Sequence, residues 1–271
     1  MTSVVTAGSP SSSVGALLRD WRQRRRLSQL DLSLDAAVSA RHLSFVETGR
    51  AKPSRELVLH LADHLDVPLR ERNGLLLAAG YAPVYGQRPL DDEAMAPVRE
   101  ALDKVLAGHE PYPAAVVDRH WDLVAANATA LTLLGSRLAP HLLEPPLNLL
   151  RAALHPDGMG PYITNLGEYS SHLLHRLRQQ AVLAQDPYLS DLFDELRAYP
   201  GVQETSPAVF DPAALVCTTM QLRLDGQDLA FFSTLASFGT ALDVTLSELI
   251  IEAFFPADKP TEAALRAMSG V

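Results

Sequence analysis

The feature that most limits the possible folds of this chain is a pair of short helical segments separated by a tight turn near the N-terminus. Ser28 is placed to cap the first segment, and Asp31 stands three residues later in the position of a capping-box acid. Ser39 is placed to cap the second, which ends at Gly49, a typical residue just beyond a helix C-terminus. A helix-turn-helix that enters the major groove of DNA has this arrangement. The pattern therefore predicts a DNA-binding unit.

Helices are also expected on both sides of this pair. Residues 14–26 carry apolar side chains at helical spacing beside a run of arginines, and two further helices are predicted over 57–65 and 69–80. His60 and His64 stand one helical turn apart, as metal ligands on a helix do. Because no general-base glutamate follows and no third ligand is suggested, we interpret them as histidines of a scaffold helix.

The stretch LRDWRQRRRLSQLDLSLDAAVSARHLSFVETGRAKPSRELVLHLADHLDV resembles the lambda-repressor-like, or Xre-type, DNA-binding domain over essentially its whole five-helix length. The specific part is the ordered set LSQ followed by S-x-x-x-L-S-x-x-E-x-G-R-x-x-P-S. The chain departs from the common pattern at Ala37, where a glycine is usual in the turn, and at Ser33, where a small alanine is usual. Both are small residues, so we expect the fold to persist.

The resemblance implies a role for each matching position. Gln29 would bind a phosphate and brace the recognition helix on the DNA, whereas Glu47 matches an acid that is more often structural. The residues expected to face base edges are Ser39, Ala40, Arg41 and Ser44. Arg41 is the strongest direct reader, because a guanidinium can donate two hydrogen bonds to guanine. The residues expected to hold backbone phosphates are Thr48, Arg50, Lys52 and Ser54.

The charge of the chain changes sign along its length. Residues 14–80 carry 11 Lys and Arg against 8 Asp and Glu, whereas residues 81–271 carry 12 against 24. The first segment is suited to a polyanion and the second is not, which indicates two modules with different partners. The predicted organisation is an arm over 1–13, a helix-turn-helix domain over 14–80, a linker and connecting helix over 81–109, and a second domain over 110–271.

Several classes of protein are disfavoured by what the sequence contains. No run approaches eighteen apolar residues, and the first residues lack the pattern of a signal peptide, so we expect a cytoplasmic, nucleoid-associated protein without membrane contact. The single cysteine, Cys217, excludes an internal disulfide and is expected in a buried strand. Nucleophile-elbow, P-loop and dinucleotide motifs are absent, so no catalytic residue, cofactor or metal is expected.

The second domain is expected to mix helices with a small antiparallel sheet. A hairpin is predicted around 118–119, and two long strands are predicted on either side of the turn at 225–228. An apolar helix is expected to close the domain over 245–256. The other helices are expected within 93–106, 127–134, 145–158, 167–183 and 188–199. The fold class is therefore mainly α with a smaller α+β part.

Three stretches of this domain resemble the ligand-binding domain of MmyB-like transcriptional regulators over roughly residues 110–268. They are WDLVAANATALTLLG, NLLRAALHPDGMGPYITNLGEYSSHLLHRLRQQ and STLASFGTALDVTLSELIIEAFFPAD. The resemblance implies a PAS-like fold, in which helices flank an antiparallel sheet. It also implies a pocket for an apolar small molecule, of which fatty acids are an example.

Candidate residues for that pocket fall into two groups. The aromatic candidates are Tyr162, Phe193, Phe231, Phe238 and Phe254, although aromatic residues at such spacing more often belong to an ordinary core. The polar candidates are Asn148, Arg151, His155, Asn165, His172 and Arg178. Arg151 or Arg178 could hold a carboxylate head group, or both could lie on solvated helix faces. His172 and His175 lack further ligands at suitable spacing, so packing or solvation is favoured over a metal site.

These observations predict a sequence-specific regulator of transcription that binds double-stranded DNA and whose second domain binds a small apolar or fatty-acid-like ligand. One helix-turn-helix contacts only a half-site, so we expect a homodimer on a two-fold symmetric operator. The alternative is a DNA-binding protein of antitoxin-like or architectural type. Its second domain would serve only for dimerisation or protein contacts.

Overall fold

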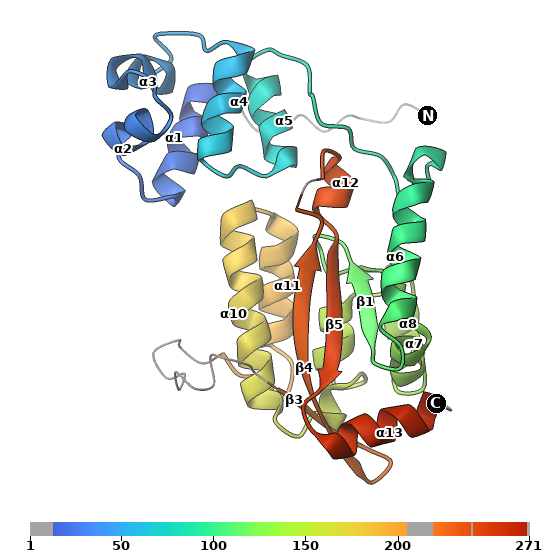
Figure 1. Cartoon of the computed structure of the whole chain (residues 1–271). Coiled ribbons are helices and arrows are strands. Elements are labelled where there is room, and N and C mark those ends of the chain that lie inside the picture. Colours follow the sequence, from blue (N-terminus) through green and yellow to red (C-terminus); the bar gives the residue numbers. More distant parts are fainter. Residues whose placement is uncertain (1–12, 205–218, 240, 270–271) are drawn as a thin grey trace, which may run out of the picture. The chain divides into compact units, whose positions relative to one another are not determined.

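The computed structural model of the protein describes residues 13–204, 219–239 and 241–269 (Figure 1). They form two compact units, and the chain passes between them at three points. Unit 1 contains the described residues of 1–88 and 240–247, and unit 2 contains those of 89–239 and 248–271. Cys217 and, apart from Ser13, the predicted arm lie outside the described residues.

Unit 1 contains the five helices that the sequence predicts. They are α1 (Val14–Arg24), α2 (Gln29–Asp35), α3 (Ala40–Glu47), α4 (Arg55–His64) and α5 (Leu69–Ala78). Ser28 and Asp31 form the predicted capping box at the start of α2, and the Ser39 hydroxyl accepts a hydrogen bond from the His42 amide at 3.1 Å. Ala37 adopts φ +50° in the turn between α2 and α3, the backbone conformation for which the family uses glycine.

A single apolar core holds these helices together. Leu43 and Val46 on the inner side of α3 are buried, and they belong to the same core as Leu18 and Trp21 of α1 and Leu61 of α4. This burial fixes which side of α3 remains accessible. The apolar stripe of α3 thus sets the orientation of this helix within unit 1.

A buried ion pair lies beside this core. The guanidinium of Arg22 donates two hydrogen bonds to the Glu47 carboxylate, at 2.7 and 2.9 Å, and the side chains are 9% and 1% exposed. Burial alone would raise the pKa of Glu47, but hydrogen bonds from Arg22 and Gln29 outweigh it and hold the pKa below its ordinary value. Glu47 therefore has the structural role that the resemblance implies.

Unit 2 is built on one antiparallel sheet with the strand order β2-β1-β5-β4-β3. The strands are β1 (Ala114–Val117), β2 (Leu123–Ala126), β3 (Met220–Leu224), β4 (Gln227–Ser237) and β5 (Ile250–Pro256). Strands from the two ends of the domain are neighbours, since β1 pairs with β5. This is the PAS-like arrangement expected from the sequence, a five-stranded antiparallel sheet with flanking helices.

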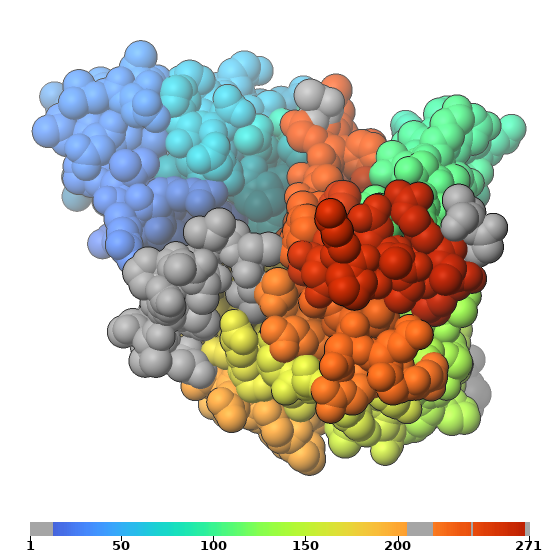
Figure 2. Space-filling model, turned by 60° about the horizontal axis from the view of Figure 1, so that its bottom comes forward, coloured from blue at the N-terminus to red at the C-terminus, as the bar shows by residue number. Residues whose placement is uncertain are grey.

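Helices and short helical turns flank this sheet. They are η1 (Glu93–Met95), α6 (Ala96–Gly108), α7 (Ala128–Gly135), α8 (Pro140–Leu143), α9 (Leu149–Leu154), η2 (Gly160–Tyr162), α10 (Leu166–Ala184), α11 (Pro187–Arg197) and α13 (Lys259–Ser269). Both α6 and α7 contact β1, and α13 contacts β4 and β5. Figure 2 shows α13, in red, lying across the orange strands on the surface of this unit.

The prediction of a helix over residues 245–256 is wrong. Residues 250–256 form β5, which pairs with β1 on one side and with β4 on the other. A strand in the middle of a sheet can be apolar on both faces, and a short apolar run of this kind cannot be distinguished from a buried helix by periodicity. The β-branched Ile250 and Ile251 and the aromatic Phe254 and Phe255 are the residues that favour a strand here.

The segment between β4 and β5 belongs to unit 1. It contains the short helix α12 (Val244–Ser247), and the Val244 amide donates a hydrogen bond to the Gly86 carbonyl at 2.7 Å. Nearby, Asn73 of α5 bonds to the backbone of Val84 and Tyr85. None of the helices in the described part of the chain has the length and apolar character needed to cross a membrane.

The buried ion pair predicts how unit 1 responds to acid. Glu47→Gln leaves the Arg22 charge buried without a counter-ion, so the free energy of unfolding of this unit should fall by about 3 kcal/mol at neutral pH. The pKa of Glu47 is lower in the folded protein than in the unfolded chain, where it is about 4.3. The ion pair therefore stabilises the wild-type protein fully above about pH 4.3, and this stabilisation is lost as the pH falls through the folded pKa. The Glu47→Gln variant should not show this acid-dependent loss of stability.

The measurement is denaturant unfolding followed by Trp21 fluorescence at several pH values. The chain has two tryptophans, so Trp121→Phe leaves Trp21 as the sole reporter. Asp66→Asn removes an exposed acid just beyond α4 and serves as the control. Equal stability and equal pH dependence in Glu47→Gln and Asp66→Asn would contradict the assigned role.

Candidate DNA-binding surface and ligand cavity

The outer side of α3 carries the predicted base-reading residues. Ala40 and Arg41 are exposed in the first turn, and Ser44 follows one turn later, partly buried. The Arg41 guanidinium lies 5.4 Å from the centre of the Phe45 ring, which sits one helical turn further along. This contact holds the long side chain along the helix. Base reading by Arg41 stays a prediction.

Two of the predicted DNA contacts also have a structural role at the start of these helices. The Ser39 hydroxyl accepts the cap hydrogen bond of α3. The side-chain amide of Gln29 donates a hydrogen bond to Glu47 at 2.8 Å and so joins α2 to α3. Its phosphate contact stays a prediction.

The turn after α3 brings together the predicted phosphate-binding residues. The Thr48 hydroxyl donates to the Ser44 carbonyl at 2.7 Å, and the Ser54 hydroxyl caps α4 by accepting from the Leu57 amide at 3.2 Å. Arg50 and Lys52 are exposed. Within the described part of the chain, neither forms an ion pair with a carboxylate. Their charges are therefore available to an external anion.

The two histidines of α4 have partners within unit 1. The His60 ring nitrogen Nε2 lies 2.7 Å from the Ala36 carbonyl, and Nδ1 of His64 lies 3.0 Å from the Asp35 carboxylate. Their rings meet edge to face at 4.6 Å between centroids. These contacts attach α4 to the end of α2, which agrees with a scaffold role.

Two groups of potential metal ligands lie in the described part of unit 2. Each has ligand atoms within 4.8 Å of one another; the groups are His141, His155 and Asp157, and Asp118, His120 and Asp122. In the first, His155 accepts a hydrogen bond from the Asp157 amide at 3.0 Å. In the second, the Asp118 carboxylate accepts from the amides of His120 and Asp122. Local turn contacts therefore account for both groups, and we assign no metal to them.

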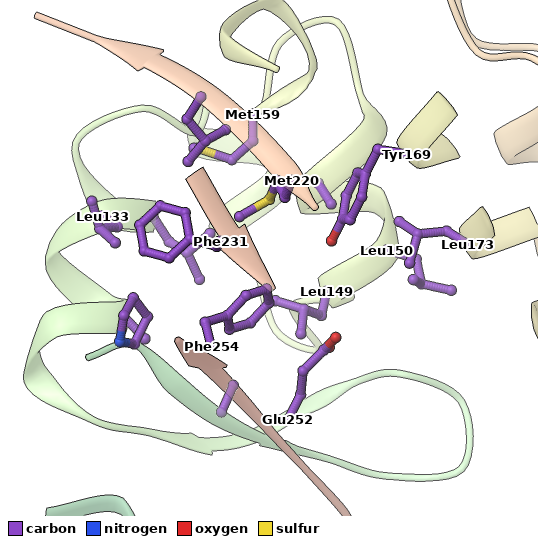
Figure 3. A pocket seen from close by; sticks show the side chains of 16 residues that line it. Leu133, Leu149, Leu150, Met159, Tyr169, Leu173, Met220, Phe231, Glu252 and Phe254 are labelled. Carbon is purple, nitrogen blue, oxygen red and sulfur yellow. The ribbon is translucent and has the colours of Figure 1, made fainter. Parts of the chain in front are cut away.

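An apolar cavity of about 80 Å³ lies inside unit 2, between the sheet and the helices α7, α9 and α10 (Figure 3). The residues contributed by the strands are Ala115, Met220, Leu222, Phe231, Glu252 and Phe254. Those contributed by helices and loops are Pro113, Ala130, Leu133, Leu134, Leu149, Leu150, Ala153, Met159, Tyr169 and Leu173. Its walls are almost wholly hydrocarbon and sulfur, as expected for a small-molecule site.

Glu252 of β5 is the charged residue in the lining of this cavity. Its side chain is 4% exposed, and its Oε1 atom accepts a hydrogen bond from the Ser233 hydroxyl at 3.0 Å. Burial raises the pKa of Glu252, although the nearby charge of Arg176 and the Ser233 hydrogen bond oppose the shift. A polar residue thus stands in a place where an apolar one would pack at lower cost.

Tyr169 of α10 adds a hydroxyl to the same side of the cavity. Figure 3 shows the oxygens of Tyr169 and Glu252 near Leu149. Burial and the Glu252 carboxylate raise the pKa of Tyr169, so its hydroxyl keeps its proton at neutral pH. Arg176, about two turns further along α10, does not line the cavity and lies over the Trp121 ring at 4.3 Å.

Of the predicted ligand-binding residues, Phe231 and Phe254 line this cavity. Among the other aromatic candidates, Tyr162 packs against the core from η2, and Phe193 lies between Arg178 and Arg197 on the outer side of α10 and α11. Phe238 is half-buried just beyond the end of β4. The structure does not bring these three to the cavity.

The predicted polar residues also lie elsewhere, and several are paired within the protein. Arg151 makes two hydrogen bonds to Glu195, at 2.8 and 2.7 Å, and Arg178 makes one to Glu204 at 2.7 Å. The side-chain amide of Asn148 bonds to the His120 carbonyl and to Asp122, and that of Asn165 bonds to the Thr219 carbonyl beside β3. His155 packs against Tyr199, and His172 is exposed on α10.

Sequence reasoning missed Glu252 and Tyr169. The signal for Glu252 was that it is the single acid within the apolar run LIIEAFF. Because this run was predicted to be a helix, the sequence did not indicate that Glu252 and Phe254 share one face. In the strand, the side chains of Glu252 and Phe254 share one face, and that face is the cavity wall. For Tyr169, the spacing along α10 gave no sign that its hydroxyl reaches a cavity.

Comparison with known proteins gives two family matches. A model described as the MmyB-like transcription regulator ligand binding domain matches residues 98–268, and one described as a helix-turn-helix domain matches residues 13–75. No curated protein matches the chain. A solved structure of a variant of RsLOV is similar at 13% identity over 64% of this chain and 78% of that chain, with a TM-score of only 0.27.

Proposed function

The chain belongs to the MmyB-like transcription regulators and combines a helix-turn-helix DNA-binding domain with a ligand-binding domain. From this premise we propose that it is a sequence-specific regulator whose affinity for its operator is changed by a small apolar ligand. It acts by binding rather than by catalysis. The observation that carries the proposal is the pairing, in one chain, of an outward-facing recognition helix with a buried apolar cavity.

The DNA-binding half of the proposal assigns different tasks to the basic residues of unit 1. Arg41, on the outer side of α3, reads a base edge, because its exposed guanidinium can donate two hydrogen bonds to a guanine. Arg50 and Lys52 in the following turn hold phosphates, which fixes the register of α3 without reading sequence. Gln29, Ser39, Ala40, Ser44, Thr48 and Ser54 complete the contact surface.

The ligand-binding half rests on the cavity in unit 2. A ligand there touches β4 and β5 through Phe231 and Phe254, and these two strands are joined by the segment that belongs to unit 1. A change in the strands therefore reaches unit 1 along the backbone itself. The ligand can alter operator affinity only through its different affinities for two arrangements of the protein, and DNA must alter ligand affinity by the same factor.

We propose that the active species is a homodimer. A single unit 1 offers one recognition helix and a net charge of +3 over residues 14–80, which is modest for a specific complex. Two copies related by a two-fold axis would contact two half-sites of a symmetric operator. The ligand would then act by shifting the placement of the two recognition helices.

Replacing Arg41 by Ala should relax base preference at one position of each half-site while keeping most non-specific binding. Losing a two-bond contact to guanine should reduce discrimination there by about 1–3 kcal/mol. Binding to a library of operator variants measures this directly, with Arg50→Ala as the comparison because it should keep the preference. Unchanged base preference in Arg41→Ala would rule out its reading role.

Replacing Arg50 or Lys52 by Ala should weaken binding to all DNA sequences to a similar extent. Each change removes a phosphate contact, so the slope of log affinity against log salt concentration should decrease by about 1. Fluorescence anisotropy over a salt series gives the slope. Arg178→Ala, an exposed arginine of unit 2, is the control and should leave it unchanged. Slopes equal to wild type in both test variants would refute the phosphate assignment.

Native mass spectrometry of the purified protein tests the dimer and the ligand together. We expect a two-subunit mass with a reproducible small-molecule adduct that is released on denaturation and can then be identified. A monomer without any adduct would count against both parts of the proposal. It would favour the alternative in which the second domain serves only protein contacts.

A further inference from the structure

The cavity of unit 2 has one polar side, and the chemistry of that side limits what can bind. We propose that the cavity binds a neutral, mainly apolar molecule carrying a hydroxyl group, and that Glu252 and Tyr169 recognise this hydroxyl. The inference rests on the proposed function, because it names the class of ligand for the same site. A ligand with a free carboxylate group is disfavoured by the same residues.

The Glu252 carboxylate has one oxygen in use and one free. The Ser233 hydroxyl donates to Oε1 at 3.0 Å, and Nη2 of Arg176 lies 3.8 Å from the same atom. Within the described part of the chain, Oε2 accepts no hydrogen bond. A ligand that brings a donor to this oxygen therefore gains a hydrogen bond in largely apolar surroundings.

Tyr169 supplies the complementary group. Tyr169 is 6% exposed, and its hydroxyl has no hydrogen-bond partner among the described residues. The side of the cavity near Leu149 therefore offers one acceptor, Oε2 of Glu252, and one donor, the phenol of Tyr169. A hydroxyl group is both donor and acceptor, so it can satisfy the two at once.

The charges around this side disfavour an ionic head group. Nη2 of Arg176 lies 3.8 Å from Oε1 of Glu252 and offsets part of its charge, although Nε and Nη2 of Arg176 are buried without a hydrogen-bond partner in the described part of the chain. Arg176 itself is outside the cavity lining and is stacked on Trp121, so a ligand carboxylate would meet the carboxylate of Glu252 before it met the guanidinium. A carboxylate offers only acceptors, and two facing acceptors leave both unsatisfied.

The walls of the cavity fit the apolar remainder of such a molecule, and its size limits that remainder. Its volume of about 80 Å³ is smaller than the roughly 150 Å³ of an apolar protein cavity that takes up benzene. In this conformation, the cavity therefore holds only a compact group. Met159 and Met220 in the wall can change rotamer to admit a longer chain, because methionine side chains are flexible.

The test compares three probes that share one alkyl chain: octanol, octylamine and octanoate. Isothermal titration calorimetry with the full-length protein, stripped of any co-purified ligand, measures the three affinities. We expect octanol to bind about tenfold or more tightly than octanoate and more tightly than octylamine, since a hydroxyl can pair with both Glu252 and Tyr169 and leaving one such buried group unpaired costs about that factor.

Variants then assign the preference to residues. Glu252→Gln places an amide donor where Oε2 stood, so the ratio of octanol to octanoate affinity should fall by about tenfold. Tyr169→Phe removes only the phenol oxygen and should weaken octanol without changing octanoate. Glu100→Gln, on the exposed side of α6, makes the same chemical change away from the cavity and should leave all three affinities unchanged. Thermal unfolding and DNA binding confirm that each variant is folded.

The outcomes separate the two proposals. Octanoate or octylamine binding as tightly as octanol, or a preference unaffected by Glu252→Gln, would overturn the hydroxyl assignment while the ligand site of the proposed function remained. Failure of every probe to bind the stripped wild-type protein would overturn both.

Discussion

The placement of the recognition helix depends on one buried carboxylate. Glu47 ends α3, accepts two hydrogen bonds from Arg22 of α1 and a third from Gln29 of α2, and so ties three helices to a single point. Removing two charges from water is expensive and is compensated only when the geometry of the pair is good. The arrangement therefore favours one relative position of α2 and α3. That position exposes Arg41 and leaves Leu43 and Val46 in the core.

In unit 2 the corresponding constraint is the central strand β5. It pairs with β1 and β4, so it joins the hairpin near the start of the domain to the hairpin near its end. One face of β5 carries Glu252 and Phe254 into the cavity, and Phe255 on the other face stacks on Phe232. The same strand thus supplies both the structural centre of the sheet and the polar group of the candidate ligand site.

Local signals predicted unit 1 far better than unit 2. Helix caps, a turn and an apolar stripe are properties of neighbouring residues, so Ser28, Ser39 and Leu43 could be placed from the sequence alone. The cavity is formed by residues more than a hundred positions apart, such as Ala115 and Glu252, and their meeting depends on strand order. Aromatic spacing within one segment does not report such pairing. Phe231 and Phe254 line the cavity, whereas Arg151 and Arg178, the predicted partners of a carboxylate, pair with glutamates of the protein itself.

A free acceptor inside an apolar cavity also bears on how ligand and DNA binding could be coupled. Within the described part of the chain Oε2 of Glu252 accepts no hydrogen bond, and a bound hydroxyl would supply one. Glu252 lies on β5, four residues after the chain leaves the segment that belongs to unit 1. A ligand that satisfies Glu252 can therefore favour one arrangement of β5 over another, which is the differential affinity that coupling requires. An apolar ligand without the hydroxyl would fill the same cavity but leave this acceptor unsatisfied, so it should be the weaker effector of the two.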